Sequence, residues 1–291
     1  MKSEMKDRSS KKENRALTTI RLVLKNPGSV AGIVIFLAII LACIIIPLVS
    51  PYTYSQIDPG NALQWPSFAH PFGTDRYGRD QLVRVAYGAR YTLSIGLFST
   101  LISVVLGVII GAVSGFFGGM VDNLIMRFLD IIQSFPQLLM AIALSAVFGT
   151  GFDKTIIAIG LTSVPNVARM LRANILTVRR QEYIEAAVTI NCSTPRIIIQ
   201  HALPNAISPL IVQIAMQIAH AGMTAAALSF IGLGVQEPLP EWGSLLSGGR
   251  AYIRDYPYLC LFPGLAIMLT TLSFNLFGDG LRDALDPKLR R

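Results

Sequence analysis

The sequence predicts an all-α protein that crosses a membrane several times. Hydrophobic residues make up 52% of its 291 residues, charged residues only 14%, and its mean hydropathy is +0.54. Soluble domains carry roughly 25% charged residues, so this composition excludes an ordinary soluble domain. Long runs without Asp, Glu, Lys or Arg alternate with shorter polar segments, which is the pattern of helices that span a bilayer.

Six segments qualify as spans, since about 20 apolar residues cross about 30 Å of hydrocarbon. Four are firm because they contain no charged residue: residues 30–49, 91–117, 206–235 and 256–278. Residues 131–148 are shorter but also uncharged, and residues 155–168 are marginal. For this fourth span along the chain, the alternative is a helix buried in the protein core.

The distribution of Lys and Arg predicts the orientation, because these residues are retained on the cytoplasmic side. With six spans both termini lie on one side, and the loops of the other side hold only seven of the 25 basic residues. Those seven are Arg76, Arg79, Arg84, Arg90, Lys154, Arg250 and Arg254. Both termini are therefore expected in the cytosol, and the net charge of +8 indicates topology rather than nucleic-acid binding.

This topology divides the chain into five parts. They are a cytoplasmic N-terminal segment (1–29), a first transmembrane helix (30–49), an outer loop (50–90), a transmembrane core (91–278) and a cytoplasmic tail (279–291). In the first part, Leu17, Ile20 and Leu24 share one helical face among basic residues, which suits a helix on the inner leaflet. A solvated tail is the alternative.

The core contains a basic cytoplasmic loop, residues 179–205, whose last part reads EYIEAAVTINCSTPRIIIQHALPN. A first helix is expected to end at Asn191 in the left-handed conformation, which Gly adopts most easily and Asn next. Thr194 is then expected as the N-cap of a second helix and Pro195 as its first residue. The Leu-Pro pair at 203–204 is expected to end that helix.

This loop resembles the EAA loop of bacterial ABC-importer permeases, which contains Glu-Ala-Ala, a Gly six residues after the Glu, and a later Leu-Pro pair. The resemblance implies that the loop docks in a groove of an ATPase subunit. The residues that it assigns to coupling are Glu182, Glu185, Ala186, Ala187, Asn191, Leu203 and Pro204. Asn191 replaces the usual Gly, which leaves the exit angle of the turn open. A juxtamembrane linker with a common tripeptide is the alternative.

Three further stretches resemble the same family. FGTDRYGRDQLVRVAYGARYTL, from residue 72, is similar to a signature of peptide- and nickel-type permeases. LSFIGLGVQEPLPEWGSLL and FNLFGDGLRDALDPKLR are typical of the "C" permease in dipeptide, oligopeptide, glutathione and nickel importers. The resemblance implies a homologous second permease, two ATPase subunits that bind ATP and Mg²⁺, and an external solute-binding protein as partners.

Charged residues and glycines are concentrated at the end of the first outer loop. Asp75, Arg76, Arg79 and Asp80 lie on tight turns just outside the membrane, where opposite charges can pair. We expect these four residues to form an internal salt-bridge clasp. Direct contact with the solute-binding protein is the alternative.

Small residues recur at every fourth position of the second span. Ser103 is followed by Gly107, Gly111, Gly115 and Gly119. This spacing lets another helix backbone approach closely, so these residues are expected to pack against a neighbouring helix. That helix could belong to this chain or to a second permease.

Polar residues inside spans are costly in lipid and therefore suggest a path for solute. Three helical stripes are candidates: Gln133 and Gln137; Gln213, Gln217, His220 and Thr224; and Thr271, Asn275 and Asp279. They could enclose one aqueous channel. The alternative is that they form interhelical hydrogen bonds that only hold the bundle together.

The chain lacks the motifs of an enzyme. No Lys follows a Gly, so the P-loop pattern GxxxxGK[ST] is absent and ATP must be hydrolysed by another chain. The three His and three Cys residues show no metal-ligand spacing, and no cofactor is expected. A secondary transporter would need acidic residues inside its spans, and a pore would not need the coupling loop. Among ABC importers, peptides are favoured over nickel, a metallophore or glutathione by family analogy alone.

Overall fold

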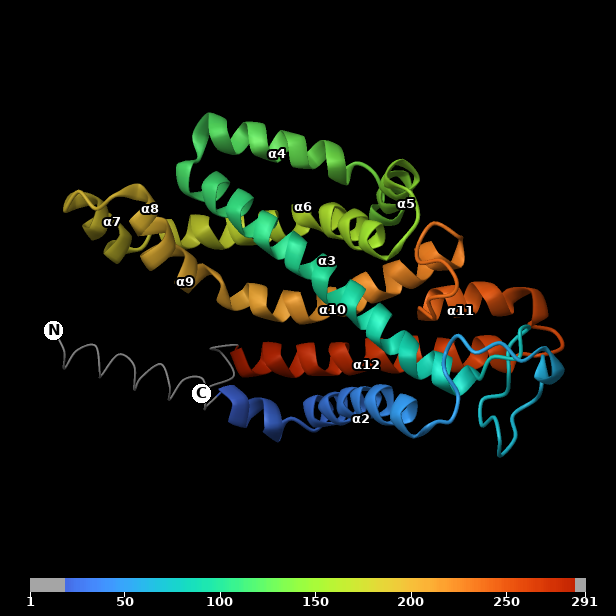
Figure 1. The fold of residues 1–291 in the computed structure, drawn as a ribbon. Coiled ribbons are helices and arrows are strands. Elements are labelled where there is room, and N and C mark those ends of the chain that lie inside the picture. The colour runs from blue at the N-terminus through green and yellow to red at the C-terminus, as the bar shows by residue number, and fades with distance from the viewer. Residues whose placement is uncertain (1–18, 286–291) are drawn as a thin grey trace.

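The computed structural model describes residues 19–285, which form an elongated bundle of helices (Figure 1). Their only bridge of β type joins Thr74 to Asp80. The long helices are α2 (Pro27–Val49), α3 (Gln81–Phe117), α6 (Phe152–Arg179), α10 (Ser208–Phe230) and α12 (Tyr258–Leu285). The shorter ones are η1 (Pro59–Asn61), α4 (Gly119–Gln133), α5 (Gln137–Phe148), α7 (Glu182–Thr189), α8 (Thr194–Arg196), η2 (Ile197–Ala202), α9 (Leu203–Ala206), α11 (Trp242–Gly249) and η3 (Arg250–Tyr252). This confirms the all-α fold class.

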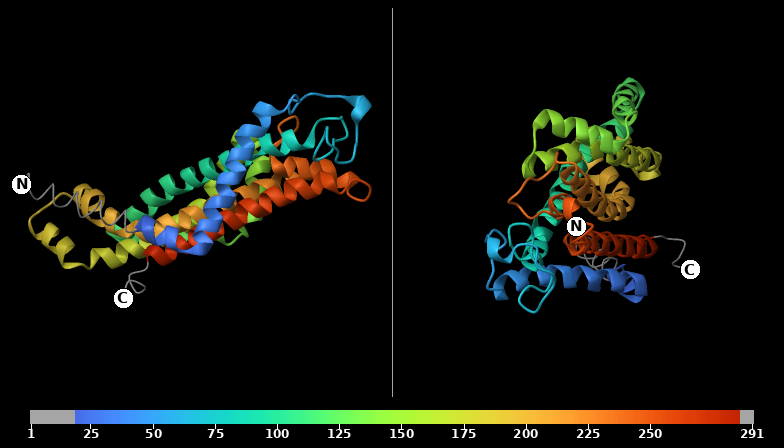
Figure 2. Two further views of the ribbon diagram at one scale, coloured as in Figure 1. Left: turned by 90° about the horizontal axis from the view of Figure 1, so that it is seen from below. Right: turned by 90° about the vertical axis from the view of Figure 1, so that its right-hand side faces the viewer.

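The two ends of the bundle carry different structures. The short helices α7, α8 and α9 lie at one end, and the loop between α2 and α3 lies with α11 at the other (Figures 1 and 2). The start of α2 and the end of α12 lie together, since the Asn26 side chain donates a hydrogen bond of 3.2 Å to Asp283. The predicted surface helix falls partly outside the described residues, because Leu17 precedes residue 19. Residues 19–25 are helical, with Ile20 and Leu24 exposed.

Within residues 19–285, four helices are long and apolar enough to cross a membrane: α2, α3, α10 and α12. α2 and α3 contain the predicted spans 30–49 and 91–117, whereas α10 is shorter than the predicted span 206–235 and α12 starts two residues later than the predicted span 256–278. A fifth crossing requires α4 and α5 to act together as one broken span. The predicted segment 155–168 lies in α6, a helix of 28 residues that carries charged residues at both ends. Ala158, Val167 and Leu171 of α6 are fully buried, as in a core helix. The count of six spans is therefore not confirmed.

The predicted continuous span 131–148 is wrong, because the chain breaks inside it. α4 ends at Gln133 and α5 starts at Gln137, and the two helices are bent by 86°. Pro136 lies between them and disfavours the helical conformation of the residue before it. Two polar side chains, Gln133 and Gln137, flank this break.

The glycine ladder of α3 packs against α6 of the same chain. A Cβ atom built on Gly107 would lie 2.6 Å from the Cβ of Val167, and one on Gly115 would lie 3.0 Å from that of Ile175. α6 contributes Gly160 to the same contact, where a Cβ would lie 2.9 Å from that of Ile102. Gly111 meets the carbonyl of Ala168 in the same way. The ladder thus lets the backbones of α3 and α6 approach closely.

Gly119 is not part of this ladder, which corrects the sequence prediction. α3 ends at Phe117, and Gly118 and Gly119 both have positive φ, at 66° and 56°. The chain reverses there into α4, and a Cβ on Gly119 would meet nothing within 4 Å. Its role is the turn rather than helix packing.

Candidate functional site

The end of the bundle that carries the EAA sequence is a helix, a tight turn and a second helical segment. α7 ends at Thr189, and Asn191 follows with φ 56°, as the sequence predicts. The amide of Asn191 donates to the carbonyl of Val188 at 2.9 Å, and the amide of Cys192 donates to that of Ala187 at 3.0 Å. These two bonds are the Schellman pattern, which fixes the direction in which the chain leaves the helix.

The second helical segment differs from the prediction in two details. Ser193 is its N-cap, so Thr194 and Pro195 are its first two residues rather than the cap and the first residue. Leu203 and Pro204 do not end it. They are the first two residues of α9. Proline is tolerated in the first turn of a helix because the N–H groups there have no partner within the helix. The chain thus runs almost continuously from α8 into α10.

The inner face of this segment packs on the chain itself. Ile184 and Ala187 of α7 join Leu171 and Ile175 of α6 and Ala112 of α3 in one buried cluster. Ala187 is only 7% exposed. Ala187 is therefore not part of the open surface of α7 in this chain, and its assignment to coupling stays a prediction. The cluster fixes α7 rigidly to the long helices α3 and α6.

The outer face of α7 is open. Glu182, Glu185 and Ala186 are exposed, and so are large apolar side chains beside them: Tyr183 is 43% exposed and Val188 57%. Ile190, at the end of α7, and Ile199, beyond the turn, are also exposed apolar residues. A hollow of about 630 Å³ lies alongside, lined by Arg179, Glu185 and Asn191 among others. We call Glu182, Tyr183, Glu185, Ala186 and Val188 the α7 outer face.

The turn at Asn191 gives a direct test of this geometry. Asn191→Gly should leave the thermal midpoint of the detergent-purified protein unchanged or slightly raised, because Gly has no Cβ to strain a positive φ. Asn191→Val should lower the free energy of unfolding by about 1–2 kcal/mol or more, the cost of the left-handed conformation. Equal midpoints for both variants would mean that the turn does not require a positive φ.

Polar side chains line a pocket at the break between α4 and α5. The pocket has a volume of about 360 Å³, and Gln133, Gln137, Thr162 and Asn166 contribute its polar lining. Gln133 donates to the Oδ1 of Asn166 at 2.7 Å, and Gln137 donates to the Oγ of Ser163 at 3.0 Å. Gln133 and Gln137 thus belong to two helices rather than to one face of a single span.

The polar stripe of α10 is divided between two environments. Gln217 is buried, and its side chain donates to the Oγ of Ser103 on α3 at 2.6 Å, which supports the alternative of interhelical bonding. His220 is exposed, while Gln213 and Thr224 are half-buried. The Thr224 hydroxyl donates to the carbonyl of His220 in its own helix at 2.8 Å. On α12, Asn275 is half-buried.

The clasp predicted among Asp75, Arg76, Arg79 and Asp80 forms only in part, at the opposite end of the bundle, because a single ion pair joins two of these four residues. Arg79 pairs with Asp75 at 2.6 Å, and Asp80 pairs with the buried His70 at 2.8 Å. The sequence prediction missed Glu237, which lies between α10 and α11 and pairs with Arg79 at 3.3 Å and Arg76 at 3.4 Å. These partners are about 160 positions apart in the chain, so no local pattern could indicate them.

A second acid near this end, which unlike Glu237 is buried, also escaped the sequence prediction. Glu241 is fully buried as the N-cap of α11, and it accepts hydrogen bonds from the amide of Ser244 at 3.0 Å and the hydroxyl of Thr92 at 3.1 Å. Burial raises the pKa of its carboxyl group, and these hydrogen bonds partly offset that effect. Glu241 thereby ties α11 to α3. Among residues 19–285, no group of three or more His, Cys, Asp or Glu is placed to hold a metal ion.

Two protein families match this chain. The family described as binding-protein-dependent transport system inner membrane component matches residues 103–291. The family described as the N-terminal TM domain of oligopeptide transport permease C matches residues 18–66. The first match includes α7 and the turn at Asn191.

Individual relatives are similar over almost the whole chain. The dipeptide transport system permease protein of Alkalihalophilus pseudofirmus is 43% identical over 266 residues, which cover 91% of this chain and 88% of that protein. The glutathione transport system permease protein of Shigella flexneri serotype 5b is 46% identical over 261 residues, or 89% and 86% of the two chains.

Solved structures show the same fold at low sequence identity. An inward-facing form of the methionine ABC transporter MetNI is 16% identical with a TM-score of 0.57, covering 69% of this chain and 96% of that one. An amino acid ABC transporter is also 16% identical, with a TM-score of 0.52 and coverage of 67% and 91%. From the family match, the relatives and the shared fold together, the chain belongs to the inner-membrane components of binding-protein-dependent transport systems, as a permease of the ABC-importer type.

Proposed function

We propose that this permease carries di- or oligopeptides across the inner membrane and is coupled to separate ATPase subunits through the α7 outer face. The main support for a peptide substrate is that the chain is 43% identical to a dipeptide permease over 91% of its own length. The chain itself is proposed to be non-catalytic and to hold no cofactor. ATP and Mg²⁺ would be bound by two ATPase subunits, and a homologous second permease and an external solute-binding protein would complete the importer.

The geometry of the α7 outer face supports the proposed coupling. A docking element must be rigid, and the buried cluster around Ile184 and Ala187 fixes α7 to α3 and α6. It must also offer surface to a partner, and exposed Tyr183, Glu185 and Val188 do so. A displacement of α7 by an ATPase would move α6 directly, and the close packing of α6 on α3 would pass the movement on to the other long helices.

The pocket at the α4–α5 break is the part of the proposed path that this chain offers most clearly. Gln133, Gln137 and Asn166 bring amide donors and acceptors to one opening of about 360 Å³. Amides suit a peptide backbone, because they can donate and accept hydrogen bonds without selecting a charge. His220 on α10 is exposed in this chain, so a second permease could complete the path there. Gln213, Thr224 and Asn275 remain candidates.

Reconstitution of the complete importer tests the substrate. ATPase activity should rise when the solute-binding protein is loaded with di- or oligopeptides, and radiolabelled peptide should accumulate in proteoliposomes. The 46% identity to a glutathione permease makes glutathione the second candidate. Stimulation by glutathione or a nickel chelate, with no response to any peptide, would contradict the peptide assignment. Failure to co-purify with any ATPase would favour a secondary transporter or a pore.

The proposed orientation places both termini and α7 in the cytosol, and cysteine labelling tests it. In a background with Cys43 and Cys260 replaced, a cysteine introduced at Gly60 should react in sealed cells with an impermeant reagent. Cys192, beside α7, should react only after the cells are opened. The distribution of basic residues gives this expectation. Labelling of Cys192 in sealed cells would show that α7 lies outside the cell, which contradicts the proposed orientation.

The two roles of the glutamines predict different effects of Leu substitution. Gln217→Leu should reduce the amount of assembled complex, because it removes the hydrogen bond between α10 and α3, worth about 0.5–1.5 kcal/mol, while the Ser103 hydroxyl keeps its bond to the carbonyl of Thr100. Gln133→Leu should leave assembly unchanged and lower the rate of uptake, because Gln133 lines the pocket. Uptake per assembled complex, measured for both variants, separates these effects. Normal uptake by Gln133→Leu would remove this pocket from the path.

A further inference from the structure

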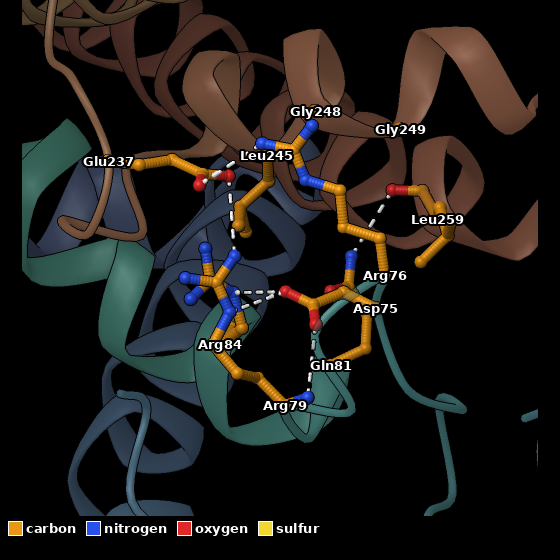
Figure 3. Close-up of a pocket in the computed structure, with 10 residues that line it drawn as sticks. All are labelled: Asp75, Arg76, Arg79, Gln81, Arg84, Glu237, Leu245, Gly248, Gly249 and Leu259. Atoms are coloured by element: carbon orange, nitrogen blue, oxygen red, sulfur yellow. Dashed lines mark hydrogen bonds and ion pairs between the residues drawn. The ribbon is translucent and has the colours of Figure 1, made fainter. Parts of the chain in front are cut away.

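A small cavity lies inside the clasp at the outer end of the bundle. Its volume is about 20 Å³, and the outer loop, α3, α11 and the start of α12 surround it (Figure 3). A volume of this size holds one group as large as a water molecule. The charged residues that line it are Asp75, Arg76, Arg79, Arg84 and Glu237.

These charges do not balance. The lining has three guanidinium groups and two carboxylates, so it carries one positive charge in excess. Asp80 does not line the cavity, and its oxygens already accept hydrogen bonds from His70 and from the amide of Val83. Arg76 and Glu237 reach solvent, with 40% and 32% of their side chains exposed, so the buried charges are those of Arg79, Arg84 and Asp75, again with one positive charge in excess. A buried charge without an opposite charge of its own is costly, because the hydration that it loses is not replaced.

The excess charge is centred on Arg84. This side chain is 1% exposed, and its Nη1 donates to the carbonyl of Tyr54 at 3.0 Å. Its Nε–H has no hydrogen-bond partner. The carboxylate oxygen that it faces, Oδ2 of Asp75, is 3.6 Å away and already accepts a hydrogen bond from the Nε of Arg79 at 2.6 Å.

The other two arginines are better compensated. Arg76 and Arg79 both pair with Glu237, at 3.4 and 3.3 Å. Each also lies over the ring of Tyr77 at 4.6 Å, and the ring face attracts a cation. Figure 3 shows Arg79 and Arg84 side by side at Asp75, with Arg76 across the cavity. A group in the cavity would therefore lie among three positive charges.

We propose that this cavity binds a single monatomic anion, chloride, held by Arg84 together with Arg76 and Arg79. Chloride would accept the unmade Nε–H bond of Arg84 and supply the missing negative charge. A water molecule could do only the first. The anion would link the loop before α3 to the segment of Glu237, and so stabilise the outer end of the bundle.

Hydrogen exchange in the complete purified importer tests this proposal. Amides at the clasp, such as those of Thr74, Asp75 and Gly78, are hydrogen-bonded within the loop. Their exchange should be about 11-fold slower in sodium chloride at ten times its dissociation constant than in sodium gluconate of equal ionic strength. Amides of α7, at the other end, serve as the internal reference. Equal clasp exchange rates in both salts would show that water alone fills the cavity.

A variant locates the site. Arg84→Gln should abolish the chloride dependence of clasp exchange and remove one saturable site for radioactive chloride per complex. Arg250→Gln is the matched control, since Arg250 lies at the same end over the ring of Phe230 but does not line the cavity. It should bind chloride as the natural chain does. An unchanged chloride effect in Arg84→Gln would place the ion elsewhere. If this variant does not assemble, the comparison of the two salts in the natural chain decides the proposal.

Discussion

Replacing Ala186 with Trp should abolish uptake and ATPase co-purification while leaving the permease itself folded. Ala186 is exposed on the α7 outer face, next to Glu185. A large side chain there would hold a docked ATPase away and break the contact that Glu185 is proposed to make. A charged hydrogen bond of about 1.5–3 kcal/mol corresponds to roughly 10- to 150-fold in affinity. Pull-down of the ATPase and the thermal midpoint of the permease measure the two effects separately.

The neighbouring Ala187→Trp provides the control. Ala187 is buried against the chain's own helices, so Trp there should lower the thermal midpoint of the permease alone. Overpacking of this kind costs about 1–3 kcal/mol, occasionally more. If Ala186→Trp keeps full uptake and full ATPase binding, the α7 outer face is not the docking surface.

Gly107→Leu should prevent the permease from reaching its folded, assembled form. A Cβ at this position already lies 2.6 Å from the Cβ of Val167, so a larger side chain must separate α3 from α6. Leu favours both the helix and the lipid, and insertion of α3 should therefore remain intact. The amount of monodisperse complex recovered from membranes should fall sharply, while the amount of inserted chain should not.

Gly264→Leu on α12 is the matched substitution. A Cβ at Gly264 would meet no atom within 4 Å, so this variant should assemble and transport normally. Equal yields of assembled complex from Gly107→Leu and Gly264→Leu would mean that the close approach of α3 and α6 is not needed for folding.

Local chemistry explains which parts of the fold are predictable from sequence. Uncharged runs within α2, α3, α10 and α12 mark these helices, because charged side chains are costly in the hydrocarbon core of the bilayer. The positive φ of Asn191 is predictable because this type of turn requires the left-handed conformation, which Gly and Asn adopt more readily than other residues. The Leu-Pro pair was misassigned for a physical reason. Proline is compatible both with the end of one helix and with the first turn of the next, and the sequence does not distinguish these positions.

The parts that could not be predicted depend on contacts between distant residues. Pro136 marks the break between α4 and α5 locally, but the angle of the bend and the burial of α6 follow from how the helices pack. Ala187 faces inward because it packs in one cluster with Leu171 and Ile175 of α6. This orientation could not be predicted, because α7 is too short to show a clear apolar periodicity. The sequence alone groups Gln217 with the solute path, because its hydrogen-bond partner Ser103 lies 114 positions earlier and no local pattern reveals that contact. The ion pairs of Glu237 are non-local in the same way.

Site-directed photo-crosslinking tests the central claim, that the α7 outer face binds the ATPase. A photoreactive phenylalanine analogue would replace Tyr183, an exposed aromatic residue of that face, or Trp65, an exposed aromatic residue at the opposite end of the bundle. In the assembled importer, the analogue at position 183 should crosslink to the ATPase subunit, and the yield should change when ATP is added. The analogue at position 65 should give no such product. A crosslink to the ATPase from position 65 and none from position 183 would contradict the account.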